Sequence, residues 1–216
     1  MKRKVLILMI FVFIIILVIM SKVKYSFKED LLYSQSDLSN YDGNQNENNK
    51  LVSRQQAINI AVKTFRYGLN IDLTASDMNQ YVSLYKNFAE QSSYIWQIGW
   101  NKKDLSKTYT CSIDSVSGNI LSIYITPREN KSNDINPIDL DDKEVLLITK
   151  KLTNELGIDL DQYNMERNYN KNGELQRNKD FKFINKHDEN NIFKISIDSI
   201  SKSIATYEDK SISGGV

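Results

Sequence analysis

The nine residues SIDSVSGNI at 112–120 return almost unchanged as SIDSISKSI at 196–204, 84 positions further along the chain. A repeat of this kind constrains the fold strongly, because both copies must satisfy the same local geometry. The chain has 216 residues, which is enough for two small domains. The sequence therefore predicts two related units, one built around each copy.

Each copy places an aspartate, Asp114 or Asp198, where a strand is expected to end and the chain to reverse. A short carboxylate at such a position can accept backbone N–H groups in an Asx turn. Gly118 continues the first turn, and Lys202 takes its place in the second, so the second turn must tolerate a side chain. We interpret both aspartates as turn residues; a metal-binding or catalytic role is the alternative.

A capped amphipathic helix is predicted before each copy. The spacing of a capping box occurs in both segments, in Ser53 with Gln56 and in Asp141 with Glu144. Apolar residues follow at helical spacing: Ile58, Ala61, Val62, Phe65 and Leu69 in the first segment, and Val145, Ile148, Leu152 and Leu156 in the second. Gly68 and Gly157 are placed to end these helices in the left-handed conformation.

Segments of strand type follow each helix. The first half offers 94–100, 108–113 and 120–125, and the second half offers 163–169, 180–184, 191–197 and 203–208. The predicted fold class is therefore α+β: an N-terminal transmembrane helix followed by two units, each a helix packed on its own antiparallel β-sheet. Tyr94, Trp96 and Trp100 share one strand face, which we assign to the core beneath the helix; partner recognition is the alternative.

The first half resembles the PepSY domain. That family has the patterns W-x-V and V-D-A-x-T-G-x-V-L, matched here by Trp96-Gln97-Ile98 and by residues 113–121. The second half departs from the pattern, because it has no Trp, Lys202 stands at the Gly position and Ala205 at the Leu position. The resemblance implies a helix laid on an antiparallel sheet. It also implies a bacterial envelope protein, similar to the spore-germination protein YpeB, that binds partners rather than catalysing a reaction.

The N-terminus predicts a membrane anchor. MKRK precedes sixteen apolar residues at 5–20, which as a helix would span about 24 Å of a roughly 30 Å hydrocarbon core. Lys22 and Lys24 can extend this span by reaching the headgroups. A cleaved signal peptide is less favoured because no small residues stand at a cleavage site, and a buried soluble helix is the remaining alternative. Since everything foldable follows the span, we expect a cytoplasmic N-terminus and an extracytoplasmic body at the cell membrane.

The rest of the chain divides by composition. Residues 25–50 are polar and Asn-rich and predict a flexible stalk. A first PepSY-like domain is expected at 51–127, a linker at 128–138, a degenerate second domain at 139–209 and a tail at 210–216. The full chain has 28 basic and 27 acidic residues, and removing the five bases of residues 1–24 leaves 23 against 27. A mildly acidic body argues against nucleic-acid binding.

Residue types that carry chemistry are few and scattered. Cys111 is the only cysteine and shares a predicted strand face with Tyr109 and Ile113, so we expect a buried, inert thiol. His187 is the only histidine and stands in a polar loop of the other half, where we expect it to be solvated. No sequence signature of a hydrolase, a phosphate-binding loop or a dinucleotide-binding fold occurs. We therefore predict no catalytic, cofactor-binding or metal-binding residues, and no cofactor.

Two acidic or amide-rich segments need separate comment. NYNKNG at 168–173 has the spacing of a calcium loop, but Asn168, Asn170 and Asn172 replace the carboxylates and Lys179 stands at the twelfth position. We interpret its Asn-Gly pair as a hairpin turn. The paired carboxylates at 139–142 and 159–161 fit helix capping better than metal binding, because no histidine lies at ligand spacing.

These features predict a non-enzymatic, membrane-anchored binding protein that modulates an envelope protein such as a cell-wall hydrolase, a protease or a sensor kinase. The alternative is an architectural protein that packs against itself. Neither a small-molecule substrate nor a nucleic-acid partner is expected.

Overall fold

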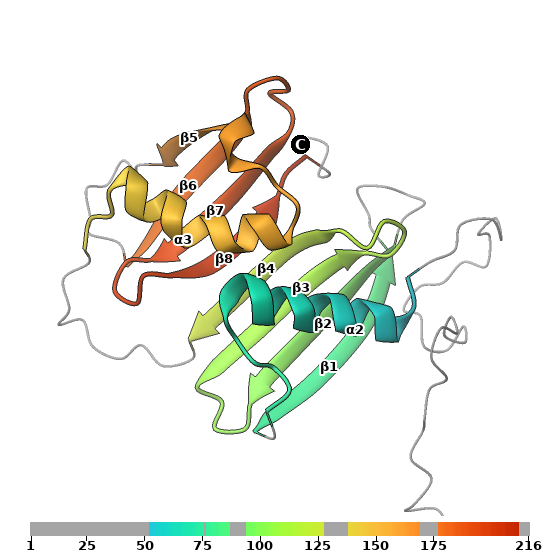
Figure 1. Ribbon diagram of the computed structural model, residues 1–216. Helices are drawn as coiled ribbons and strands as arrows, with labels where there is room; N and C mark the ends of the chain where they lie inside the picture. The colour runs from blue at the N-terminus through green and yellow to red at the C-terminus, as the bar shows by residue number, and fades with distance from the viewer. Residues whose placement is uncertain (1–51, 76, 87–93, 128–137, 169–176, 212–216) are drawn as a thin grey trace, which may run out of the picture.

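The structure is a computed structural model that describes residues 52–75, 77–86, 94–127, 138–168 and 177–211. Within these ranges all eight strands form one antiparallel sheet, in the order β1-β2-β3-β4-β8-β7-β6-β5. The strands are β1 Met78–Lys86, β2 Tyr94–Lys102, β3 Lys107–Asp114, β4 Ile120–Pro127, β5 Tyr163–Asn168, β6 Asn178–Asn185, β7 Ile192–Asp198 and β8 Ser203–Asp209. Figure 1 shows the first-half strands in green continuing into the orange and red strands of the second half.

The predicted fold class is wrong, because the described residues form one eight-stranded sheet with two helices and not two separate helix-on-sheet units. Strands β4 and β8 pair through three residue pairs, Ser122 with Glu208, Ile123 with Tyr207 and Tyr124 with Thr206. Hairpin signals in a sequence specify which neighbouring strands pair. They carry no information on whether the last strands of two distant segments meet, which depends on tertiary packing.

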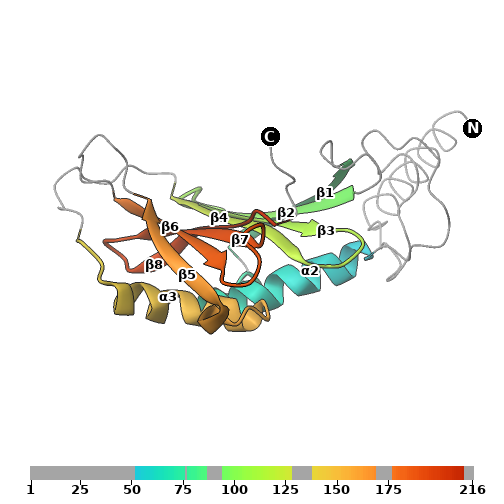
Figure 2. The ribbon, with the colours of Figure 1, turned by 90° about the horizontal axis from the view of Figure 1, so that it is seen from above.

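Two helices cover one face of this sheet. Helix α2, Arg54–Lys63, continues into the π-helix η2, Thr64–Gly68, and helix α3 spans Asp142–Glu155. Both predicted capping boxes are present. Figure 2 shows α2 and α3 side by side on the same face, with no described element over the other face. A short 3₁₀ turn, η3 at Leu160–Gln162, leads from α3 into β5.

The prediction for Gly157 is confirmed, because its φ is +74°. For Gly68 the predicted helix end is confirmed, since η2 ends there, but the predicted left-handed conformation is wrong. Gly68 does not adopt a left-handed conformation; it lies where η2 meets α3. A Cβ atom at this position would stand 3.0 Å from Leu152 Cδ1 and 3.3 Å from Leu152 Cα. Nearby, Lys63 Nζ lies 3.0 Å from a carboxylate oxygen of Glu155. Gly68 therefore permits close contact between the helices of the two halves, and the sequence alone does not reveal that partner.

The core lies between the sheet and the helices. Tyr94, Trp96 and Trp100 are each 2% exposed, so their assignment to the core is confirmed. The Trp96 indole N–H donates to the carbonyl of Val52, just before α2, at 2.8 Å. In the second half Phe193 is surrounded by the rings of Phe183, Tyr163 and Tyr207. Strand β1 was not predicted, because its residues Met78–Lys86 carry only a weak alternating pattern.

The repeated sequence builds the same turn twice. Asp114 accepts the backbone N–H groups of Val116 and Ser117, and Asp198 accepts those of Ile200 and Ser201. The predicted Asx turns are therefore confirmed at both aspartates. The register also shifts at equivalent places, between residues 112 and 113 and between residues 196 and 197.

The two turns differ at one position. Gly118 has a φ of +76° and Lys202, its counterpart, a φ of +49°. Lys202 accepts this strained conformation with a side chain, and its Nζ lies 2.7 Å from Glu144 Oε1 in the capping box of α3. In the second half the turn is thus tied to its helix by an ion pair.

Several predictions lie outside the described residues: the anchor at 1–24, the stalk at 25–50, and the Asn-Gly turn within 169–176. The linker at 128–138 and the tail at 210–216 are described only at residues 138, 210 and 211. None of the helices that the structure describes has the length and apolar character of a membrane span.

Candidate functional site

The residues that could have carried chemistry are dispersed. Cys111 is fully buried in β3, and desolvation raises the pKa of its thiol far above the usual value. His187 is exposed in the β6–β7 loop, and its backbone N–H donates to Asn185. Among the described residues, no three His, Cys, Asp or Glu side chains gather closely enough to hold a metal ion.

The paired carboxylates serve the ends of helices. Asp141 caps α3 and Asp159 caps the 3₁₀ turn. Arg167 on β5 reaches Asp142 at 2.6 Å and Asp139 at 3.4 Å, and it donates to the carbonyl of Leu140. In the calcium-like segment, Asn168 ends β5 and Lys179 lies in β6, while Asn170 and Asn172 are outside the described residues.

The surface best suited to binding is the sheet face opposite α2 and α3, which we call the open face. Residues directly opposite one another in successive strands form rows across a sheet. The strand register places two polar rows on this face. The tyrosine row is Tyr81, Gly99, Thr110, Tyr124, Thr206, Ser196 and Asp180, and the lysine row is Ser83, Gln97, Ser112, Ser122, Glu208, Lys194, Lys182 and Glu166.

A pseudo-twofold axis relates the two halves of the open face. The axis passes between Ile123 and Tyr207, the central pair of the β4–β8 junction, because these residues are equivalent in the repeat. It exchanges Tyr124, which belongs to the tyrosine row, with Glu208, which belongs to the lysine row. The tyrosine-row residues of the first half of the chain are therefore equivalent to the lysine-row residues of the second half. The two halves thus share their turns, but equivalent positions of the open face carry tyrosine and hydroxyl groups in the first half and charged groups in the second.

The first half of the open face is uncharged and aromatic. Tyr81 lies across the neighbouring strand, since a Cβ atom at Gly99 would fall 1.9 Å from the Tyr81 ring. Its hydroxyl lies 3.2 Å from Thr110 Oγ1, one strand further on. Tyr81 is 40% exposed and Tyr124 is 38% exposed. The absence of a side chain at Gly99 thus leaves room for a tyrosine to lie flat on the sheet with much of its surface available.

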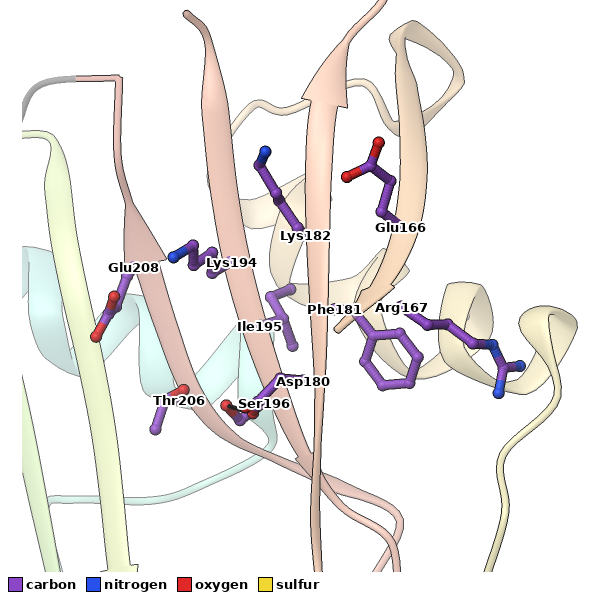
Figure 3. A pocket seen from close by; sticks show the side chains of 10 residues that line it. All are labelled: Glu166, Arg167, Asp180, Phe181, Lys182, Lys194, Ile195, Ser196, Thr206 and Glu208. Atoms are coloured by element: carbon purple, nitrogen blue, oxygen red, sulfur yellow. Dashed lines mark hydrogen bonds between the residues drawn. The ribbon is translucent and has the colours of Figure 1, made fainter. Parts of the chain in front are cut away.

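The second half forms a shallow charged hollow of about 500 Å³ (Figure 3). Glu166, Lys182, Lys194 and Glu208 stand directly opposite one another in successive strands. Each lysine therefore has a glutamate on one side and the other lysine on the other side. Beside this row, the Ser196 hydroxyl donates to Asp180. Figure 3 shows Arg167 pointing away from these side chains toward α3.

A side-chain hydrogen bond joins the two halves of the open face at the β4–β8 junction. The Tyr124 hydroxyl donates to Glu208 Oε1 at 2.6 Å. Burial and this bond raise the pKa of Tyr124 to about 12. Burial by itself would raise the pKa of Glu208, but hydrogen bonds from Lys210 and Tyr124 outweigh it and lower that pKa. The pair therefore stays as a neutral phenol and a carboxylate across the neutral pH range.

Comparison with solved structures identifies one similar fold, the C-terminal domain of YpeB from Bacillus megaterium. The TM-score is 0.54 at 11% sequence identity, over 77% of this chain and 67% of that chain. The fold is PepSY-like. At this identity the likeness concerns the fold alone. Neither the models of protein families nor the curated proteins include a match to this sequence.

The open face was not predicted from the sequence. Its residues alternate with the buried ones along each strand, so the alternation within 94–100 and 191–197 did indicate which side chains face away from the core. What the sequence did not reveal was the alignment of these positions into rows, because that alignment needs the β4–β8 pairing and the position of β1.

Proposed function

We propose that this chain is a non-enzymatic binding protein of the bacterial cell envelope, held at the membrane by residues 1–24 with its body outside the cytoplasm. It modulates a protein partner of the class of cell-wall hydrolases, proteases or sensor kinases. The observation that carries this proposal is the open face, a broad polar and aromatic surface that none of the described helices covers. The similarity to the YpeB domain supports the fold on which the proposal is built.

The dimensions of the open face suit a protein partner. Eight strands spaced about 4.8 Å apart give a width of about 34 Å between the outer strands. With about 20 Å along the strands, the area comes close to the roughly 800 Å² that one partner contributes to an ordinary interface. Tyrosines near the centre of an interface carry much of its binding energy, and Tyr81 and Tyr124 are the exposed aromatic residues of the two rows.

Crosslinking in membranes tests this function. A photoreactive residue at Ser83 or Thr206 on the open face should crosslink a heterologous envelope protein, and the double substitution Lys182→Glu with Lys194→Glu should abolish the adduct. Lys107→Glu is the matched control, because this exposed lysine stands at the start of β3 outside the two rows. Adducts between copies of the chain alone would instead establish the architectural role, and adducts unaffected by the lysine reversals would refute the open face as the binding site.

A further inference from the structure

The outer side of α3 has an unusual composition for a surface helix. Leu147 is 75% exposed and Leu146 is 40% exposed, although both belong to a helix whose inner side is well packed. Lys143, Lys150 and Lys151 are exposed on the same side. At 100° per residue, Lys143, Leu147 and Lys150 fall within about 60° of one another, with Leu146 and Lys151 on either flank. We call these five residues the α3 outer stripe.

The stripe points directly away from the core. Val145, Thr149 and Leu152 are fully buried and occupy the opposite side of the helix. Figure 2 shows α3 in the outer layer, with no described element beyond it. Leu147 therefore contributes little to the packing of the described fold, and Leu146 is only partly covered by it. Scattered apolar residues are ordinary on a protein surface, but here two adjacent leucines are framed by three lysines.

The charges of the stripe are not neutralised within the described part of the chain. Among those residues none of its three lysines forms an ion pair, whereas most acidic residues of the same helix do. Glu155 pairs with Lys63, Glu144 with Lys202, and Asp142 with Arg167. Asp141 is occupied as the helix cap at the N-terminal end. The middle of α3 thus presents uncompensated positive charge around two exposed leucines.

We propose that the α3 outer stripe docks on the headgroup layer of an anionic membrane. Leucines enter the boundary between headgroups and acyl chains, while lysines on the same helix bind anionic headgroups. Charge complementarity selects this occupant, because the lysines would repel a basic surface and the leucines would remain hydrated against a purely polar one. The proposal relies on the proposed anchoring only to bring the domain near the membrane.

Docking through α3 orients the whole sheet. The helices lie on one face and the two polar rows on the other, so the open face turns away from the lipid toward the cell wall or the outer part of a membrane protein. The same fold would thus have a lipid-facing side and a partner-facing side.

The test uses the full chain with a polarity-sensitive fluorophore on Leu147→Cys. Cys111 is fully buried, so the introduced cysteine labels selectively in the folded protein. In vesicles of phosphatidylcholine and phosphatidylglycerol the emission should shift to the blue and be protected from iodide. Each lysine near an anionic surface raises the ratio of docked to undocked molecules about fivefold, so neutralising all three by Lys→Gln substitution should lower that ratio about a hundredfold. The fluorophore on Lys194→Cys, on the open face, is the matched control and should remain quenchable.

Equal quenching of the Leu147 and Lys194 positions in anionic vesicles would overturn the proposal. So would a blue shift that appears only when another protein is added, since that result would assign the stripe to a protein groove. Flotation of the variant with all three stripe lysines replaced by glutamine separately measures anchoring by residues 1–24, because the lysines no longer bind the vesicles. Failure of that variant to float would refute the anchor, and the Leu147 fluorophore on the chain with its lysines intact would still test the stripe.

Discussion

Removing the aromatic centre of the second half should destabilise the first half, because both belong to one sheet. Phe193 is 2% exposed, and its ring centroid lies 4.6 Å from Phe183, 5.0 Å from Tyr163 and 6.0 Å from Tyr207. Phe193→Ala leaves a cavity in this cluster, and such substitutions cost about 3–5 kcal/mol. With a urea dependence of about 2 kcal/mol per molar, the unfolding midpoint should fall by about 2 M.

Tryptophan fluorescence makes the measurement specific to the first half. The chain has two tryptophans, Trp96 and Trp100, and both lie in β2, which three strands separate from β7 in the sheet order. If the eight-stranded sheet unfolds as a single cooperative unit, the tryptophan transition shifts as much as the circular dichroism signal. Phe193→Leu, which retains most of the volume, should shift both by much less.

The reasoning would be refuted if the tryptophan transition of Phe193→Ala superimposed on that of the unaltered chain while circular dichroism showed an earlier phase. The two halves would then unfold independently, and the three residue pairs of the β4–β8 junction would be too few to couple them.

Three further predictions concern single sites. Gly68→Val should destabilise the chain by about 1–3 kcal/mol in urea unfolding, because the new side chain meets Leu152 in the contact between the helices. Since the pKa of Tyr124 is raised from 10.0 to about 12 in the folded state, its contribution to stability is complete below pH 10 and is lost as the pH rises to about 12. Tyr124→Phe should reduce the fall in melting temperature as the pH rises from 10 to about 12. If the variant and the unaltered chain showed the same dependence of melting temperature on pH, the role of the bond to Glu208 would be contradicted. The Cys111 thiol should react with a disulfide reagent only as fast as the chain unfolds, and a fast reaction in the native state would contradict its burial.

The local architecture was largely accessible from the sequence. The capping boxes and the Asx turns join partners that lie within a few residues of one another, so a short stretch of sequence is enough to predict them. They are the capping boxes at Ser53 and Asp141 and the turns at Asp114 and Asp198. The alternation through Trp96 and Trp100 identified the core side of β2 for the same reason. The weakly patterned β1 was missed, because its polar and apolar residues do not alternate clearly.

The candidate site was less accessible. Tyr81 is significant only because it crosses Gly99 toward Thr110, and these three residues are neighbours in space through register alone. Lys182 and Lys194 likewise lie opposite each other only because of the register between β6 and β7. No single segment of the sequence contains the open face.

The sequence by itself determined that two related halves exist, where their helices begin and how their repeated turns close, because hydrogen bonds between near neighbours in the chain fix these features. Tertiary structure decided that the halves share one sheet, that Gly68 at the end of η2 permits contact between helices, and that the polar rows run across both halves. These outcomes depend on how surfaces far apart in the chain fit together, and the free energy of that fit is spread over many residues that carry no common pattern.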